Sequence, residues 1–283
     1  MGLVVRSVGV RKVWITGAVL AAVLVSGQMT GQPANAKEPD GVVISNKSVF
    51  RYAVSAGTIE QQSTVQYEEM TRQAASKRSL LGPEHPQTQR MRAIAQRLLP
   101  HANKFNERAK DWKWEINVLD SPQINAFCMP GGKIAVFTGI LQKLQLTDDE
   151  AAMVMGHEIG HALYEHARVR AGKQMALGAG RAVAGLLFGQ LGDIVGAGAG
   201  SLASLKFSRN DETQADLIGL ELAARAGYDP RAGITLWQKM SKASQGAPPQ
   251  WMSTHPSGET RIKVIKDHIP EVIGLYEKAK LTR

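Results

Sequence analysis

The sequence contains a single cysteine, Cys128, among its 283 residues. One cysteine cannot form a disulfide within its own chain, so we expect Cys128 to be a small buried apolar residue. Tryptophan, tyrosine and phenylalanine make up only 6 % of the chain, and its 34 lysines and arginines are scattered. A net charge of +9 without basic runs gives no indication of nucleic-acid binding, although it favours weak attraction to an anionic membrane surface.

The first 36 residues contain no acidic side chain, and their three basic residues precede an apolar run at residues 13–27. That run is short for a membrane-spanning helix and has the length of a signal-peptide core. Residues 34–36 (Ala-Asn-Ala) offer a small-x-small cleavage site. This pattern predicts a secretory signal over residues 1–36 and a periplasmic mature chain from Lys37. Retention of the segment as an uncleaved membrane anchor is the alternative.

The most informative motif is HEIGH at residues 157–161. Thr147 and Glu150 form a capping box ahead of it, and no proline follows for twenty residues, which predicts a helix. Residues four apart share one face of a helix, so His157 and His161 can hold one Zn²⁺ from the same side. Two ordinary histidines on a helix face would be the alternative.

The residue after the first histidine, Glu158, is placed to accept a proton from a water molecule at the metal as general base. A catalytic zinc site needs a third protein ligand. Tyr164 and Ala167 exclude the metzincin pattern, in which glycine and histidine occupy these positions. On a continuing helix, Glu165 would lie two turns from the first histidine as a solvent-facing acid, and His166 would point elsewhere.

A second predicted helix, over residues 211–226, carries two acids four residues apart. Glu212 and Asp216 therefore share a face. We assign Glu212 to the metal as third ligand, and Asp216 as acceptor for the free N–H of a ligating histidine. Surface acids on an amphipathic helix would be the plainer explanation of this pair.

Hydrophobic periodicity predicts four further helices, over residues 59–81, 88–105, 231–243 and 258–283. Breaks are expected at Pro100 and Pro270. Residues 112–118 alternate between apolar and polar side chains and predict a strand. The Gly/Ala-rich stretch 171–206 predicts either a helical hairpin in the core or a lid over the site that could touch a membrane.

A turn at residues 130–132 precedes a β-prone run composed of Lys133, Ile134, Ala135, Val136, Phe137 and Thr138. This run predicts either a plain hairpin strand or an edge strand beside the metal-binding helix. An edge strand could pair with an extended substrate through backbone hydrogen bonds. We take the run as the expected substrate strand.

The sequence resembles the membrane-associated zinc metallopeptidases related to HtpX and the CAAX prenyl proteases, especially exported bacterial members such as LoiP and BepA. The resemblance spans residues 67–261 and rests on HEIGH at 157–161, ETQAD at 212–216, NAFCMPGGKIAVFTG at 125–139 and THP at 254–256. It implies that Glu212 is the third ligand. It also implies that His255 faces the site, where it steadies the developing oxyanion or holds the water position in a resting state.

The expected architecture is a mainly helical α+β fold, a zincin-type peptidase domain over residues 67–283 with a small sheet beside the HEIGH helix and a lead-in at 37–66. The expected function is a zinc-dependent endopeptidase of the bacterial cell envelope, with one zinc ion per chain and unfolded or misfolded envelope proteins as substrates. Further expected partners are the membrane surface or the outer-membrane assembly machinery.

Two alternatives remain open at this stage. The chain could be a chaperone-like binding protein for outer-membrane assembly intermediates with little proteolysis. It could also be a zinc hydrolase of the deformylase kind, with the Cys128 thiolate as third ligand.

Overall fold

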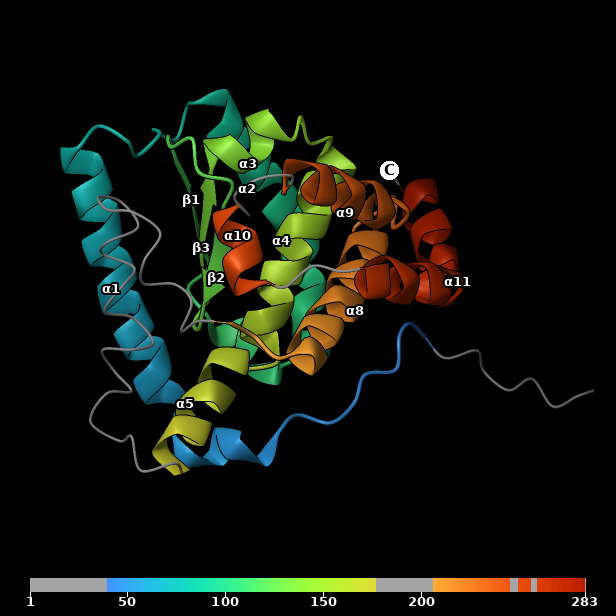
Figure 1. Cartoon of the computed structure of the whole chain (residues 1–283), viewed down its shortest axis with the longest axis horizontal. Helices are drawn as coiled ribbons and strands as arrows, with labels where there is room; N and C mark the ends of the chain where they lie inside the picture. Colours follow the sequence, from blue (N-terminus) through green and yellow to red (C-terminus); the bar gives the residue numbers. More distant parts are fainter. Residues whose placement is uncertain (1–39, 177–205, 245–248, 256–258, 283) are drawn as a thin grey trace, which may run out of the picture. The chain divides into compact units, whose positions relative to one another are not determined.

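The structure is a computed structural model that describes residues 40–176, 206–244, 249–255 and 259–282 (Figure 1). Its elements are η1 (Val49–Ala53), α1 (Ala56–Ser76), α2 (Pro86–Leu98), η2 (Leu99–Lys104), η3 (Glu107–Asp111), β1 (Glu115–Leu119), β2 (Ala126–Met129), β3 (Lys133–Phe137), α3 (Thr138–Lys143), α4 (Asp148–Leu163), α5 (His166–Ala176), α8 (Arg209–Arg225), α9 (Ala232–Ala243), α10 (Gln250–Thr254) and α11 (Glu259–Leu281). The predicted signal segment and residues 177–205 of the predicted hairpin or lid lie outside the described residues. No helix within these ranges combines the length and apolar character needed to cross a membrane.

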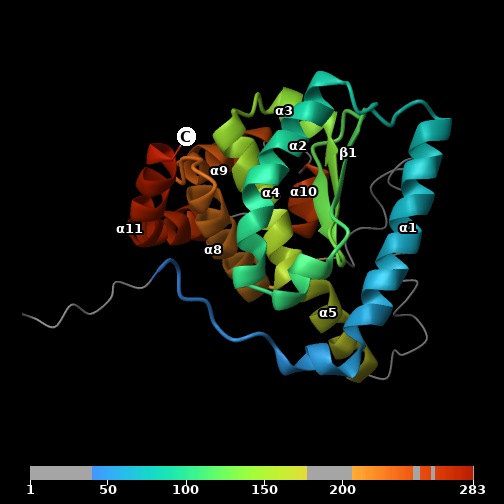
Figure 2. The same ribbon diagram turned by 180° about the vertical axis from the view of Figure 1, so that it is seen from behind.

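The three strands form one sheet in the order β1-β3-β2, with β1 parallel and β2 antiparallel to β3. Side chains alternate along β3, so its two faces serve two clusters. Ile134 and Val136 pack into the main core, whereas Ala135 and Phe137 pack into a smaller cluster that α1 covers. Together with the main-core helix α4, α1 encloses the sheet, as both views of the chain show (Figures 1 and 2). The predicted mainly helical fold with a small sheet is confirmed.

The expected edge position of the 133–138 strand is wrong. β3 is the central strand, paired on both sides, and every residue from Lys133 to Phe137 is buried. Thr138 already begins α3. An extended substrate therefore cannot pair with this strand. Among the described residues, β2 rather than β3 has a side without a strand partner, and β2 packs against α4.

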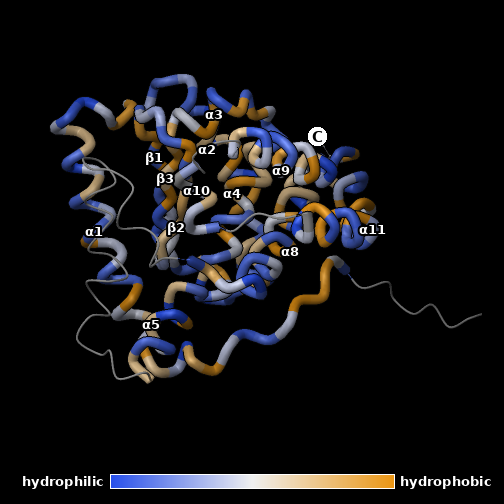
Figure 3. The backbone as a smooth tube through the Cα atoms, viewed as in Figure 1, coloured by the Kyte–Doolittle hydropathy of each residue, from blue (hydrophilic) through white to orange (hydrophobic). Residues whose placement is uncertain are grey.

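The helix that carries HEIGH is the central element of the fold. Thr147 accepts a hydrogen bond from the Glu150 amide and Glu150 returns one to the Thr147 amide, so the predicted capping box is confirmed. Every residue of α4 from Glu150 to Leu163 is buried, because β2, α2, α8 and α9 all pack around it. In Figure 3 the hydropathy of α1 alternates along the helix, as expected for a helix with one buried face.

Glycine brings α4 and α8 unusually close together. A β-carbon built on Gly219 would lie 2.7 Å from the amide nitrogen of His157, and one on Gly156 would lie 3.0 Å from the Gly219 carbonyl oxygen. A β-carbon on Gly160 would lie 2.9 Å from the carbonyl oxygen of Ala215. The two backbones can approach this closely only because these positions lack side chains. The close contact places the predicted ligands of α4 beside those of α8.

The predicted helices differ from the observed ones at three places. Residues 163–166 do not continue one helix: α4 ends at Leu163, Glu165 adopts φ 59°, and α5 begins at His166. α1 ends at Ser76 rather than at residue 81. α11 stays helical through Pro270 and bends (Figure 1). The carbonyl that loses its partner there belongs to the exposed Lys266 and can be solvated.

Candidate metal centre

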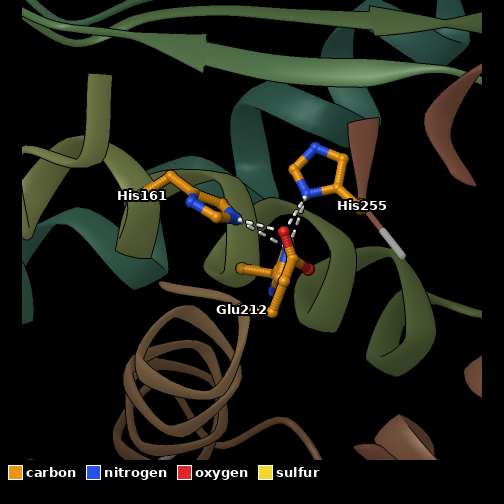
Figure 4. A group of neighbouring side chains, drawn as sticks. His161, Glu212 and His255 are labelled. Atoms are coloured by element: carbon orange, nitrogen blue, oxygen red, sulfur yellow. Dashed lines mark hydrogen bonds and ion pairs between the residues drawn. The ribbon is translucent and has the colours of Figure 1, made fainter. Parts of the chain in front are cut away.

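Four buried side chains converge between α4, α8 and the end of α10. They are His157, His161, Glu212 and His255, and one donor atom from each lies within 4.8 Å of all the others. Figure 4 shows His161, Glu212 and His255 pointing toward one another from three different elements. The structure thus brings together the two HEIGH histidines, the proposed third ligand and the histidine that only the family resemblance had indicated.

The distances between these donor atoms suit one zinc ion. His157 Nε2 lies 3.1 Å from His161 Nε2 and 3.2 Å from His255 Nδ1. Glu212 oxygens lie 3.6 Å from the first two nitrogens and 3.1 Å from the third. Ligand bonds of about 2.0–2.1 Å in tetrahedral geometry separate donor atoms by about 3.3–3.4 Å. Three imidazoles and one carboxylate at this spacing form a donor set that fits Zn²⁺.

Asp216 holds the first histidine from behind. Its Oδ1 accepts from His157 Nδ1 at 3.0 Å, which leaves Nε2 unprotonated toward the other donors. Arg261 of α11 donates to both Asp216 and Glu212. Burial opposes ionisation of both carboxyl groups. At Glu212 this effect is outweighed by His255 and the charge of Arg261, and at Asp216 by the charge of Arg261 and by hydrogen bonds from His157 and Arg261, so the pKa of each acid is lowered. Both acids are therefore carboxylates at neutral pH.

His161 is supported by different groups. Its Nδ1 lies 2.8 Å from Nδ1 of His166, and His166 Nε2 lies 2.9 Å from Gln214 Oε1. Burial lowers the pKa of His161 well below its usual value, and the neighbouring histidines reinforce this. An unprotonated imidazole is the form that binds a metal. His166, which a continuing helix would point elsewhere, is thus a direct neighbour of a candidate ligand.

Glu158 lies beside this cluster but outside it. The indole N–H of Trp251, on α10, donates to Glu158 Oε1 at 2.5 Å, and His255 Nε2 lies 3.6 Å from the same oxygen. Trp251 is fully buried and stacks on both Trp237 and His255. In this conformation the candidate general base is held by the element that also carries His255.

The deformylase-like alternative finds no support in this geometry. Cys128, on β2, is not among the four converging residues, and it is half-buried rather than fully buried. Burial raises the pKa of its thiol well above the ordinary value, and the charge of Glu158 adds to the rise.

Comparison with known proteins identifies the family. The profile of peptidase family M48 matches residues 86–269. The chain belongs to peptidase family M48. Metallopeptidases of this family use zinc, in agreement with the donor set described above. The membership confirms the resemblance predicted from the motifs.

Three relatives illustrate the match. Mitochondrial metalloendopeptidase OMA1 of Arabidopsis thaliana is 38 % identical over 60 % of this chain, which spans only 35 % of that protein. Metalloprotease LoiP of Escherichia coli (strain K12) is 28 % identical over 89 % of this chain and 96 % of its own length. The beta-barrel assembly-enhancing protease of the same organism is 28 % identical over 62 % of this chain and 37 % of its own length.

Proposed function

We propose that this chain is a zinc-dependent endopeptidase of the bacterial cell envelope that cleaves unfolded or misfolded envelope proteins. The observation that carries the proposal is the convergence of four buried donor atoms beside Glu158, within a chain of peptidase family M48. The envelope location is supported by the predicted signal segment and by the match over nearly the whole of LoiP.

Each residue at the centre has a proposed role. His157, His161 and Glu212 hold the zinc ion, which when bound polarises the substrate carbonyl and makes a water molecule more acidic. Glu158 accepts the proton of that water and later delivers a proton to the leaving amine. Asp216, fixed by Arg261, keeps the first histidine in the tautomer that exposes Nε2 to the metal.

The described conformation is proposed to be a resting state. Nδ1 of His255 occupies the fourth donor position, and Trp251 binds the oxygen of Glu158 that would accept a proton. The amide of Trp251 also donates to the carbonyl of Ile124 at 3.1 Å, just ahead of β2. One short helix, α10, therefore engages the metal centre, the general base and the start of the sheet edge. It must move before water and substrate can enter.

The outer edge of β2 is the proposed place for an extended substrate, in place of β3. The Phe137 amide donates to the Asn125 carbonyl, so odd-numbered residues of β2 face β3 and the backbone groups of Ala126 and Cys128 point outward. β2 also packs against α4, the helix that carries Glu158. A peptide paired along this edge would therefore pass the candidate general base.

Cleavage of unfolded casein by the chain from Lys37, with zinc content measured in the same sample, tests the proposal. We expect EDTA to stop cleavage and zinc to restore it. Glu158→Gln should keep zinc, because Glu158 is outside the donor cluster, but lower the rate by about 10²- to 10⁴-fold. Glu165→Gln is the matched control, since Glu165 is also largely buried but pairs with Arg168.

Undiminished cleavage by Glu158→Gln would refute the assigned mechanism. One relative is a beta-barrel assembly-enhancing protease, so a role of this chain in outer-membrane assembly is the second candidate function. The chaperone-like alternative, in which the chain binds assembly intermediates, predicts a different result for the same variant. If the chain is mainly a binding protein, Glu158→Gln should still restore normal growth in a deletion strain. Loss of that restoration supports proteolysis as the function.

A further inference from the structure

The second metal-binding histidine is connected by hydrogen bonds to a part of the chain outside the family match. We propose that His166, Gln214 and Ser45 form a positioning relay, which fixes the proton of His161 on Nδ1 and leaves Nε2 free for the metal. Ser45 precedes the matched residues, 86–269. The proposal rests on the proposed function, since it takes His161 to be a zinc ligand.

The direction of each hydrogen bond follows from the outer end of the relay. The amide group of Gln214 lies 3.2 Å from the backbone carbonyl oxygen of Ser45 and 2.8 Å from its Oγ. A carbonyl oxygen can only accept, so the side of Gln214 that faces Ser45 must be its NH₂ group. Its oxygen, Oε1, therefore faces His166 and must accept from it.

The orientation of Gln214 determines the hydrogen bonds nearer the metal centre. Because Oε1 of Gln214 accepts, Nε2 of His166 carries the proton, and Asp211 Oδ1 at 3.9 Å from the same nitrogen favours this arrangement. A singly protonated His166 then has a free lone pair on Nδ1, which accepts from Nδ1–H of His161 at 2.8 Å. Nε2 of His161 is left unprotonated, 3.1 Å from Nε2 of His157.

The outer end of the relay is firmly anchored. The amide of Val42 donates to the buried carboxylate of Glu221 at 2.9 Å, and Lys47 Nζ donates to the carbonyl of Leu163 at 2.8 Å. Gly41, at φ +104°, would place a β-carbon 2.1 Å from Glu221, so only glycine fits there. These contacts lie on both sides of Ser45 and hold its carbonyl against α8. The segment from Gly41 to Lys47 is therefore fixed against the two helices that carry the metal ligands.

The experiment measures zinc affinity by chelator competition in the chain from Lys37. His166→Ala removes the acceptor of the His161 proton and should weaken zinc binding by about 10- to 100-fold. Gln214→Leu removes only the outer acceptor and should have a smaller effect in the same direction. His268→Ala is the control, because the ring nitrogens of His268 interact with Val264 and Glu271 of its own helix, α11.

A second measurement reads the proton itself and needs no metal. Ring ¹⁵N NMR of the zinc-free chain should show His161 protonated on Nδ1 in the wild type and a mixture of tautomers in Gln214→Leu. Melting of each zinc-free variant, followed by circular dichroism, verifies that it is folded.

The outcomes separate the two proposals. Two results would overturn the relay and leave the proposed function intact. In the first, the wild type binds zinc and folded His166→Ala binds it with the same affinity. In the second, His161 of the wild type is protonated on Nε2. A wild-type chain that binds no zinc would refute the proposed function and, with it, the role of the relay.

Discussion

Replacing Gly219 by alanine should separate α8 from α4 and disturb the metal centre. The added β-carbon would lie 2.7 Å from the His157 amide nitrogen, so the backbones must move apart by about 0.7 Å to reach ordinary contact at 3.4 Å. A metal site tolerates displacements of only about 0.5 Å. Overpacking costs about 1–3 kcal/mol, against about 1 kcal/mol gained from better helix propensity. We expect a net loss of up to about 2 kcal/mol in the free energy of unfolding and at least about tenfold weaker zinc binding.

Urea unfolding measures the first quantity and chelator competition the second. Gly274→Ala is the matched control, because Gly274 lies within α11 and a β-carbon there would meet nothing within 4 Å. That variant should gain about 0.5–1 kcal/mol and keep wild-type zinc binding and casein cleavage. The reasoning is refuted if Gly219→Ala is as stable as Gly274→Ala and binds zinc as tightly as the wild type.

Two further predictions concern zinc removal and pH. EDTA should lower the melting temperature by about 5–10 °C, because zinc at 100 times its dissociation constant stabilises the folded state by about 2.7 kcal/mol in a domain of this size. Thermal melts followed by fluorimetry measure this shift, and an unchanged melting temperature in EDTA would contradict a zinc-bound fold. Burial lowers the pKa of Lys47 to about 8, against about 10.4 unfolded, so the unfolded chain binds more protons between these pH values and stability rises with pH. The unfolding free energy of the wild type minus that of Lys47→Met should therefore increase from about pH 8 to about pH 10. A difference that stays constant in urea titrations across this range would contradict the prediction.

Local spacing was enough to predict the elements that carry most of the donors. Thr147 and Glu150 mark the start of α4, because a capping box is encoded within four residues. The helical repeat then places His157 and His161 on one face. These inferences need no knowledge of how distant parts of the chain meet, and the structure agrees with them.

Predictions failed where the outcome depended on a local break or on strand order. No glycine or proline marks the end of α4, and Glu165 reverses the chain at φ 59°, so the sequence pattern concealed that His166 turns back toward the site. The run at 133–138 was correctly identified as a strand, but nothing within it shows that β1 would pair on its other side.

The distant partners of the buried acids were also missed. Two carboxylates buried side by side require a neighbouring cation, so the assignment of Glu212 and Asp216 to the buried site was enough to predict that a lysine or arginine lies beside them. With 34 lysines and arginines in the chain, however, no spacing singles out Arg261, which comes from α11 and also stacks on Trp237. Trp251 likewise reaches Glu158 across 93 residues of sequence.

One turn of α8, residues 212–216, accounts for the geometry of the whole centre. It supplies a metal donor in Glu212, the acceptor behind His157 in Asp216, the hydrogen-bond partner of His166 in Gln214, and the close backbone contact at Ala215. Successive residues of a helix are rotated by about 100°, so sliding α8 by one residue against α4 would misplace all of these groups together. The glycine contacts between the two helices exclude that slide. Precise packing of backbone on backbone is thus what makes a five-residue motif able to position a metal site.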